Sequence, residues 1–310
     1  MREGRGMQNL FSISHDDNVT SLAIGKFDGL HRAHRALFAS LGAGGAVLVV
    51  QIPKQILSSI AMKQELIPFP IFEVQWESIR DLSGADFFAL LMRKFPRLSR
   101  VVVGEDFRFG KNRECGAGDI ACLFAGEAVV IPEISYHGCP IHTDTICALL
   151  QNGEIARANE LLGRIYAIEG AVVRGQGLGK KNLIPTLNVC APDFVQPQSG
   201  VYLTYAKLDD LLYRSISFLG NRLSTDNQFA FETHLLAPER GMPHVIENAS
   251  VYLFETQIPS KMSVYFLQRL RANRKFADLS ELRGQIEHDV QQARTLHQAI
   301  ALPLAREENA

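Results

Sequence analysis

The pattern of apolar residues changes near the middle of the chain. In the first half, short apolar runs suited to buried strands alternate with helix-like segments. The strand-like runs are residues 20–24, 45–50 and 100–103, and the helix-like segments are residues 31–41 and 86–93. Continuous apolar strands separated by helices are typical of a parallel sheet covered on both faces. The first half is therefore predicted to be an α/β domain.

The second half contains short strand-like segments separated by turn signals. These segments are residues 166–173, 200–207, 212–219, 229–236 and 249–254. Such spacing favours a small antiparallel β-barrel. A terminal helix follows, in which Asp278 and Glu281 are spaced as in a capping box. Its apolar stripe is expected to pack on the barrel and consists of Leu282, Ile286, Val290, Ala293 and Ile300.

A predicted helix pair over residues 144–163, interrupted at Asn152-Gly153, separates the two halves. At 310 residues the chain has the length of two domains. We place the boundary after Gly163, giving residues 1–163 and residues 164–310.

Composition and charge exclude several classes of protein. Lys and Arg total 32 against 33 Asp and Glu, so no basic excess favours a nucleic-acid partner. No apolar run approaches the roughly 20 residues needed to span a bilayer. The polar start lacks the apolar core of a secretory signal, and Met7 is a second candidate start. Five cysteines without a C-x-x-C pair argue for reduced thiols in a cytoplasmic protein.

A Pro-Thr-Leu-Asn sequence follows a glycine-rich basic run, residues 174–181. Thr186 and Asn188 are two residues apart, so an extended backbone turns both toward one side. Both supply neutral oxygen ligands, which suit a Mg²⁺ ion whose charge is balanced mainly by phosphates. The glycines allow backbone N–H groups to approach those phosphates closely. The alternative interpretation is a turn followed by an ordinary strand.

Two histidines follow the first predicted strand, within the segment Gly25 to His34. His31 and His34 are three residues apart on a predicted helix and therefore face the same way. Phosphates bind at such strand–turn–helix joints, where helix-terminal N–H groups are unsatisfied. Two imidazoles there can stabilise a phosphoryl transition state by positioned donors. The alternative is a Phe-Asp-Gly turn with surface histidines.

A second loop, Val103 to Gly110, leaves another predicted strand. Its two phenylalanines can sandwich a planar ring, or they are simply buried in a hairpin-like loop. In the second half, Glu232 and His234 share one face of a predicted strand. A carboxylate at that position is suited to accept a proton from a substrate hydroxyl, although a solvated strand face is the simpler alternative.

Together, these motifs resemble the bacterial bifunctional riboflavin kinase/FMN adenylyltransferases, the FAD synthetases. The resemblance covers nearly the whole chain, in the same order. It rests on Gly25–His34, Val103–Gly110, Arg174–Asn188, Gly200–Tyr202 and Glu232–Leu236. It implies a Rossmann-like nucleotidyltransferase domain with a parallel sheet, followed by a riboflavin kinase-like barrel with a terminal helix.

The resemblance also implies roles for individual residues. Thr186 and Asn188 would hold Mg²⁺ on the ATP phosphates, and Glu232 would deprotonate the ribityl 5′-hydroxyl of riboflavin. His31 and His34 would contact ATP phosphates in the first domain. Nucleotide or flavin would also be held by Gly25, Phe27, Asp28, Gly29, Gly104, Asp106, Phe107, Phe109, Gly175, Gly177, Gly179 and Lys180.

The first domain departs from the family pattern at two positions. Ala33 replaces a glycine of the histidine motif, and Cys147 stands where an arginine that reaches the ATP phosphates is expected. A cysteine cannot supply a forked cationic donor. Asp144 adds negative charge nearby. The candidate compensating cations are Lys26, Arg32 and Arg108.

We therefore expect an enzyme that phosphorylates riboflavin to FMN and adenylylates FMN to FAD, releasing pyrophosphate. Its substrates would be riboflavin, FMN and Mg-ATP, with no nucleic-acid or membrane partner. One alternative is a riboflavin kinase whose adenylyltransferase domain is weak or inactive. The other is a non-catalytic flavin- or nucleotide-sensing module.

Overall fold

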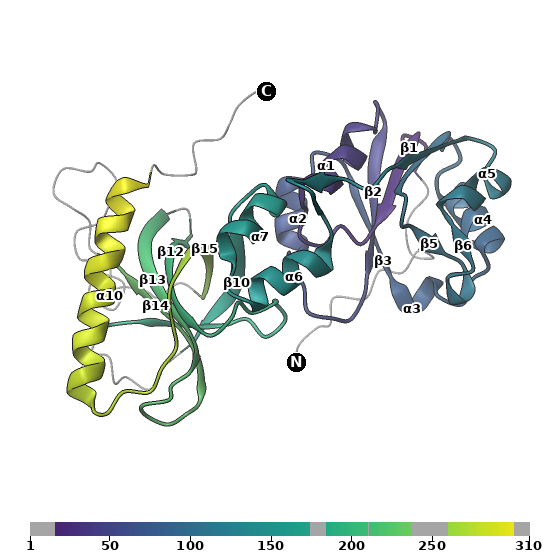
Figure 1. Ribbon diagram of the computed structural model, residues 1–310. Coiled ribbons are helices and arrows are strands. Elements are labelled where there is room, and N and C mark those ends of the chain that lie inside the picture. Colours follow the sequence, from purple (N-terminus) through teal and green to yellow (C-terminus); the bar gives the residue numbers. More distant parts are fainter. Residues whose placement is uncertain (1–15, 174–183, 210, 237–259, 301–310) are drawn as a thin grey trace. The chain divides into compact units, whose positions relative to one another are not determined.

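The computed structural model describes residues 16–173, 184–209, 211–236 and 260–300. The chain divides into two compact units (Figure 1). The first contains the residues up to Ile146 together with Leu161–Gly163, and the second contains Cys147–Glu160 and the residues from Arg164 onward. The boundary placed after Gly163 stays a prediction. The glycine-rich run and the expected strand over residues 249–254 lie outside the described residues.

The first unit is built on a five-stranded parallel sheet with the order β3-β2-β1-β4-β7. Its strands are β1 (Ser21–Gly25), β2 (Gly45–Gln51), β3 (Ile71–Gln75), β4 (Arg100–Gly104) and β7 (Glu127–Ile131). The expected parallel sheet is thus confirmed.

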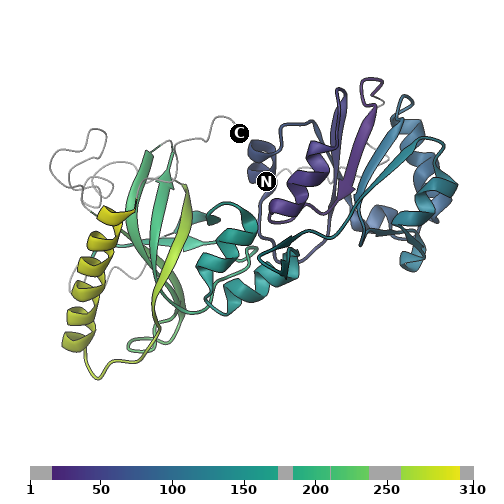
Figure 2. The same cartoon turned by 45° about the horizontal axis from the view of Figure 1, so that its top comes forward.

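Both faces of this sheet are covered. Val101 and Val103 of β4 pack in a cluster with Phe88, whereas Val102 packs with Phe38 in a cluster on the other face. Neighbouring strand residues point to opposite faces, so apolar residues in succession require helices on both sides. Phe38 comes from α1 (Arg32–Ala39) and Phe88 from α4 (Gly84–Lys94); α1 lies along the sheet in Figure 2.

Smaller elements complete the first unit. They are α2 (Ile60–Leu66), α3 (Trp76–Ile79), α5 (Ile120–Leu123) and the two-stranded ladders β5 (Arg108–Phe109) with β6 (Cys115–Gly116) and β8 (Ser135–Tyr136) with β9 (Cys139–Pro140). Ser59 and Ser83 cap α2 and α4, accepting hydrogen bonds from Met62 N and Asp86 N, each at 3.1 Å. The expected helix pair is present as α6 (Thr143–Gln151) and α7 (Ile155–Leu162), and most of it belongs to the second unit.

The second unit contains a closed six-stranded barrel with the order β10-β11-β14-β13-β12-β15. Its strands are β10 (Tyr166–Val173), β11 (Leu187–Cys190), β12 (Gly200–Leu208), β13 (Leu211–Asn221), β14 (Phe229–Leu235) and β15 (Lys261–Ala272). All pairings are antiparallel, and β15 closes the barrel by pairing with both β10 and β12. The expected barrel is confirmed.

The barrel interior is partly polar. Hydroxyl groups of Thr204, Ser215, Ser217 and Thr233 form a buried chain with oxygen–oxygen distances of 2.8 to 2.9 Å. Because each hydroxyl has a partner, the cost of removing it from water is offset.

The terminal helix α10 (Leu279–Ala299) packs along one side of the barrel (Figure 1). Asp278 caps it, accepting bonds from Ser280 N and Glu281 N, both at 2.8 Å. Ala293 is fully buried in the contact, and Val290 packs beside it. Among the described residues, no helix is both long and apolar enough to cross a membrane.

Candidate functional site

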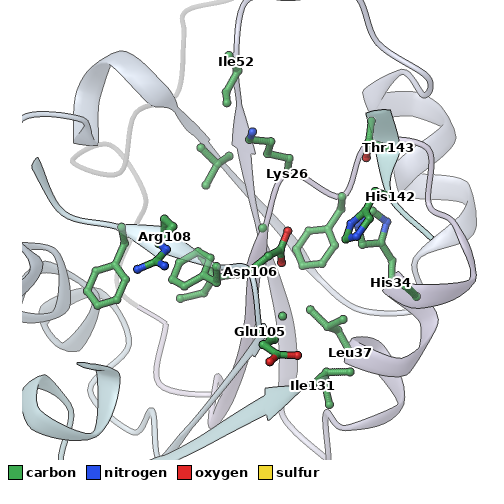
Figure 3. A pocket seen from close by; sticks show the side chains of 18 of the residues that line it. Lys26, His34, Leu37, Ile52, Glu105, Asp106, Arg108, Ile131, His142 and Thr143 are labelled. Atoms are coloured by element: carbon green, nitrogen blue, oxygen red, sulfur yellow. The ribbon is translucent and has the colours of Figure 1, made fainter. Parts of the chain in front are cut away.

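A pocket of about 640 Å³ lies in the first unit, at the carboxyl edge of its sheet. Residues that end or follow each of the five strands line it, among them Gly25, Lys54, Trp76, Gly104 and Ile134. Ligands bind at this edge of parallel α/β sheets. Figure 3 shows Lys26 and Asp106 near its centre, with His34 and His142 on one side and Arg108 on the other.

The two predicted histidines both line the pocket. His31 is the residue before the first turn of α1, and its ring stacks on that of His34 with centroids 3.6 Å apart. Phe27 meets the His34 ring edge-on at 5.2 Å. Burial, the neighbouring His31 and Lys63 lower the pKa of His34 well below its usual range. His34 is therefore neutral at pH 7 and can offer an N–H group without adding positive charge.

The loop between β1 and α1 has an unusual backbone. Phe27 and Leu30 have φ angles of 46° and 47°, and Gly29 has φ 81°. Such conformations cost free energy in residues other than glycine and persist where surrounding contacts impose them.

Asp28 supplies those contacts. Its Oδ1 accepts hydrogen bonds from Leu57 N at 2.8 Å and Ser58 N at 3.1 Å. Lys63 Nζ donates to Lys26 O at 3.2 Å from below the same loop. Asp28 is buried, and neither it nor Gly29 is among the residues that line the pocket. Their predicted binding roles stay predictions, and the geometry gives Asp28 a supporting role.

Positive and negative side chains are mixed in the pocket. The cations are Lys26, Lys54, Arg108 and Arg113, and the acids are Glu105, Asp106, Glu133 and Asp144. Partial burial lowers the pKa of Lys26, and the charges of Lys54 and Arg113 lower it further. Three cations therefore act on one another in the pocket, and an anionic ligand would relieve their repulsion.

The second predicted loop also reaches the pocket. Gly104, Asp106, Phe107 and Phe109 all line it. The two phenyl rings stack with centroids 5.5 Å apart. Phe109 is at the same time part of the apolar core, so it serves packing as well as lining the pocket.

Some of the residues that depart from the family pattern line the pocket, and others do not. Ala33 lines the pocket, as do His142, Thr143 and Asp144, which precede Cys147 in the chain. Cys147 is not among the lining residues. Lys26 and Arg108 line the pocket, whereas the Arg32 guanidinium lies over the Tyr136 ring, 4.8 Å from its centroid.

A second constellation lies on the barrel. Asn188 of β11 pairs directly with Glu232 of β14. Their neighbours Leu187 and Thr233 are buried, so alternation turns Asn188 and Glu232 to the outer face. Thr186 comes two residues before Asn188, next to the start of β11. Asn188 and Glu232 thus belong to one face of two paired strands, and Thr186 directly precedes one of them.

The surroundings of these residues are specific. Pro185 O lies 2.7 Å from His234 Nδ1, which ties the segment before β11 to β14. Arg222 Nη1 donates to Glu232 Oε1 at 3.2 Å. Burial raises the pKa of the Glu232 carboxyl, while Arg222 opposes that rise.

The donor set suits a magnesium ion better than a transition metal. The Thr186 hydroxyl and the Asn188 amide offer neutral oxygen atoms beside a carboxylate, which is the chemistry that Mg²⁺ prefers. Throughout the described ranges, no cluster of three or more His, Cys, Asp or Glu side chains could hold a metal. The remaining predicted binding residues, Gly175, Gly177, Gly179 and Lys180, lie outside the described residues.

Sequence reasoning missed several residues, both in the pocket of the first unit and on the barrel. Lys54 follows the end of β2, so it could have been found by asking what lies at the carboxyl edge of every strand. Arg113 lies in the same loop region as the predicted aromatics. Lys63 and Arg222 carry no sequence signal, because their contacts arise only from the tertiary fold.

Comparison with known proteins defines the class. The family model Flavokinase, described as riboflavin kinase, matches residues 162–297, which include the barrel and most of α10. The part of the chain that forms the barrel is therefore similar to riboflavin kinases.

Curated relatives extend the likeness to the whole chain. The bifunctional riboflavin kinase/FMN adenylyltransferase of Escherichia coli strain K12 is 28% identical, covering 94% of this chain and 96% of its own. The protein of that name from Pseudomonas fluorescens is 27% identical with the same coverage. The resemblance inferred from the motifs is confirmed: the chain is a relative of these bifunctional proteins along nearly its full length.

A solved structure supports the fold alone. A Streptococcus pneumoniae protein named as a macrolide-efflux protein superposes with a TM-score of 0.74 at 21% identity, covering 92% of this chain and 97% of its own.

Proposed function

We propose that this chain makes FMN from riboflavin and FAD from FMN, using ATP in both reactions. Its bifunctional relatives and the similarity of its barrel to riboflavin kinases support this proposal. Riboflavin, FMN and ATP would be its partners, and we propose a cytoplasmic location.

The barrel would carry the kinase reaction. Glu232 would accept the proton of the ribityl 5′-hydroxyl of riboflavin. The hydroxyl oxygen would attack the γ-phosphorus of ATP as the bond between that phosphorus and ADP breaks. Thr186 and Asn188 would hold Mg²⁺. When bound, that ion neutralises phosphate charge. The observation that carries this assignment is the direct pairing of Asn188 with Glu232 on the outer face of the barrel.

The pocket of the first unit would carry adenylyl transfer. A phosphate oxygen of FMN would attack the α-phosphorus of ATP, and pyrophosphate would leave. Neutral His34 would donate a hydrogen bond to phosphate oxygen, together with His31. Lys26, Lys54 and Arg113 would supply the positive charge that Cys147 cannot.

The two alternatives are not favoured. The relatives are named for both activities. The pocket also contains cations, although Cys147 stands where the family has an arginine. A purely sensory module would have no use for a carboxylate paired with the predicted metal ligand Asn188.

Chromatography of the products tests the proposal. Purified protein incubated with riboflavin and Mg-ATP should form FMN first and then FAD. If FMN forms but FAD does not, even when FMN and ATP are supplied directly, the result would support the kinase activity alone. Flavin binding without either product would favour the sensory module.

A further inference from the structure

Arg222 lies in the turn that connects β13 to β14. Backbone hydrogen bonds tie that turn, from Arg222 N to Gln228 O at 2.9 Å and from Asn227 N to Arg222 O at 3.1 Å. The position of Arg222 is thereby fixed relative to both strands.

The Arg222 guanidinium is held along one edge by Asp226. Nε donates to Asp226 Oδ1 at 3.0 Å and Nη2 donates to Asp226 Oδ2 at 2.8 Å. This is the bidentate geometry in which a guanidinium and a carboxylate bind most firmly. The arginine side chain is only 17% exposed, so water screens its charge weakly.

The third contact points at the proposed base. Nη1 of Arg222 donates to Glu232 Oε1 at 3.2 Å. The bidentate pair with Asp226 would by itself hold the turn, so the bond to Glu232 adds something that the turn does not require. This hydrogen bond occupies Oε1 of Glu232 and leaves Oε2 to accept a hydrogen bond or a proton from another group.

We propose that Arg222 is a positioning residue for Glu232, with Asp226 locking Arg222 in place. This inference rests on the proposed kinase function. The guanidinium fixes the orientation of the Glu232 carboxylate beside Asn188 and supplies a positive charge next to it. Burial and the negative charge of Asp226 favour the protonated carboxyl, which cannot act as a base, and Arg222 opposes both effects.

The test measures kcat and the KM for riboflavin in FMN formation by the full chain, with saturating Mg-ATP. Arg222→Gln should lower kcat about tenfold or more. The KM for riboflavin should stay nearly unchanged, because a positioning residue acts on the base and not on substrate binding. Arg222→Lys keeps the charge but loses the fork, so it should restore only part of the lost kcat. Arg283→Gln is the matched control, because it breaks an exposed ion pair on α10 with Glu287.

The outcomes separate this inference from the function on which it rests. If Arg222→Gln and wild type have equal kcat, Arg222 does not position the base. If Arg222→Gln raises the KM for riboflavin as much as it lowers kcat, the loss reflects a disturbed binding site, and the inference is likewise overturned. If wild type forms no FMN, or Glu232→Gln forms it at the wild-type rate, the proposed function itself fails.

Discussion

The rings of His31 and His34 stack face to face, with centroids 3.6 Å apart and planes 18° apart. Two charged imidazoles at that distance would repel one another, and His31 contributes to the lowered pKa of His34. His34 therefore offers a hydrogen-bond donor to a ligand in the pocket without adding positive charge.

His34→Ala should reduce FAD formation from FMN and ATP by about a hundredfold or more, the usual effect of removing a positioned donor. FMN formation should not change, because the kinase residues lie on the barrel. His137→Ala, at an exposed position in the same unit, is the control. Equal FAD formation by both variants would remove His34 from the reaction.

Arg113→Gln should raise the KM for ATP in FAD formation and lower kcat/KM by about tenfold. The reason is that Arg113 is one of three cations that interact within the pocket. Arg97→Gln removes an exposed charge from the same unit and should have no effect. If Arg113→Gln and Arg97→Gln have the same kcat/KM for FAD formation, the charge that compensates for Cys147 comes from other residues.

Much of the architecture could be predicted from the sequence, because it depends on periodicity. Runs such as Val101–Val103 have only one environment that buries every residue, a parallel strand between helices. The strand β15 was not predicted as an element, although it closes the barrel. Its first six residues alternate between more exposed and buried positions, whereas the rest mixes charged and apolar residues, so only part of the strand carries a local signal.

The two sites could be predicted in part. The shared position of His31 and His34 was expected from helical spacing, although His31 lies just before α1 in extended backbone, and the common face of Asn188 and Glu232 follows from alternation along strands. The role of Asp28 was harder to predict, because its partners, Leu57 and Ser58, are about thirty residues away in sequence. Arg222 is missed for a related reason: ten residues separate it from Glu232, and only the hairpin brings them together.

Asp289→Ala should destabilise the barrel unit by about 3 kcal/mol, because removing one partner of a buried pair strands the other. Asp289 is nearly fully buried and binds the Arg271 guanidinium at 2.7 and 2.9 Å, which fastens α10 to β15. Denaturant unfolding followed by circular dichroism measures the loss. The exposed pair of Arg283 is the control, and Arg283→Gln should cost less than about 1 kcal/mol. Equal losses would show that the buried pair adds no more than an exposed one.

Stability should fall as pH drops below about 6.5. Burial lowers the pKa of His297 on α10, which contacts Ser215 O at 3.1 Å and is near Arg214. In the unfolded chain the same histidine takes up a proton at higher pH, so acid favours unfolding. Melting temperatures between pH 8 and pH 5.5 should decline less steeply for His297→Gln than for wild type. Parallel declines would assign the acid sensitivity to other groups.

The central claim is that Glu232 is the base of the kinase reaction, and a Glu232→Gln variant tests it most directly. Riboflavin binding and FMN formation are measured on the same preparation, and FAD formation from supplied FMN shows whether the other unit is intact. If Glu232 is the base, we expect nearly unchanged riboflavin affinity, normal FAD formation and a loss of FMN formation of at least about a hundredfold. FMN formation at the wild-type rate by Glu232→Gln would contradict the central claim.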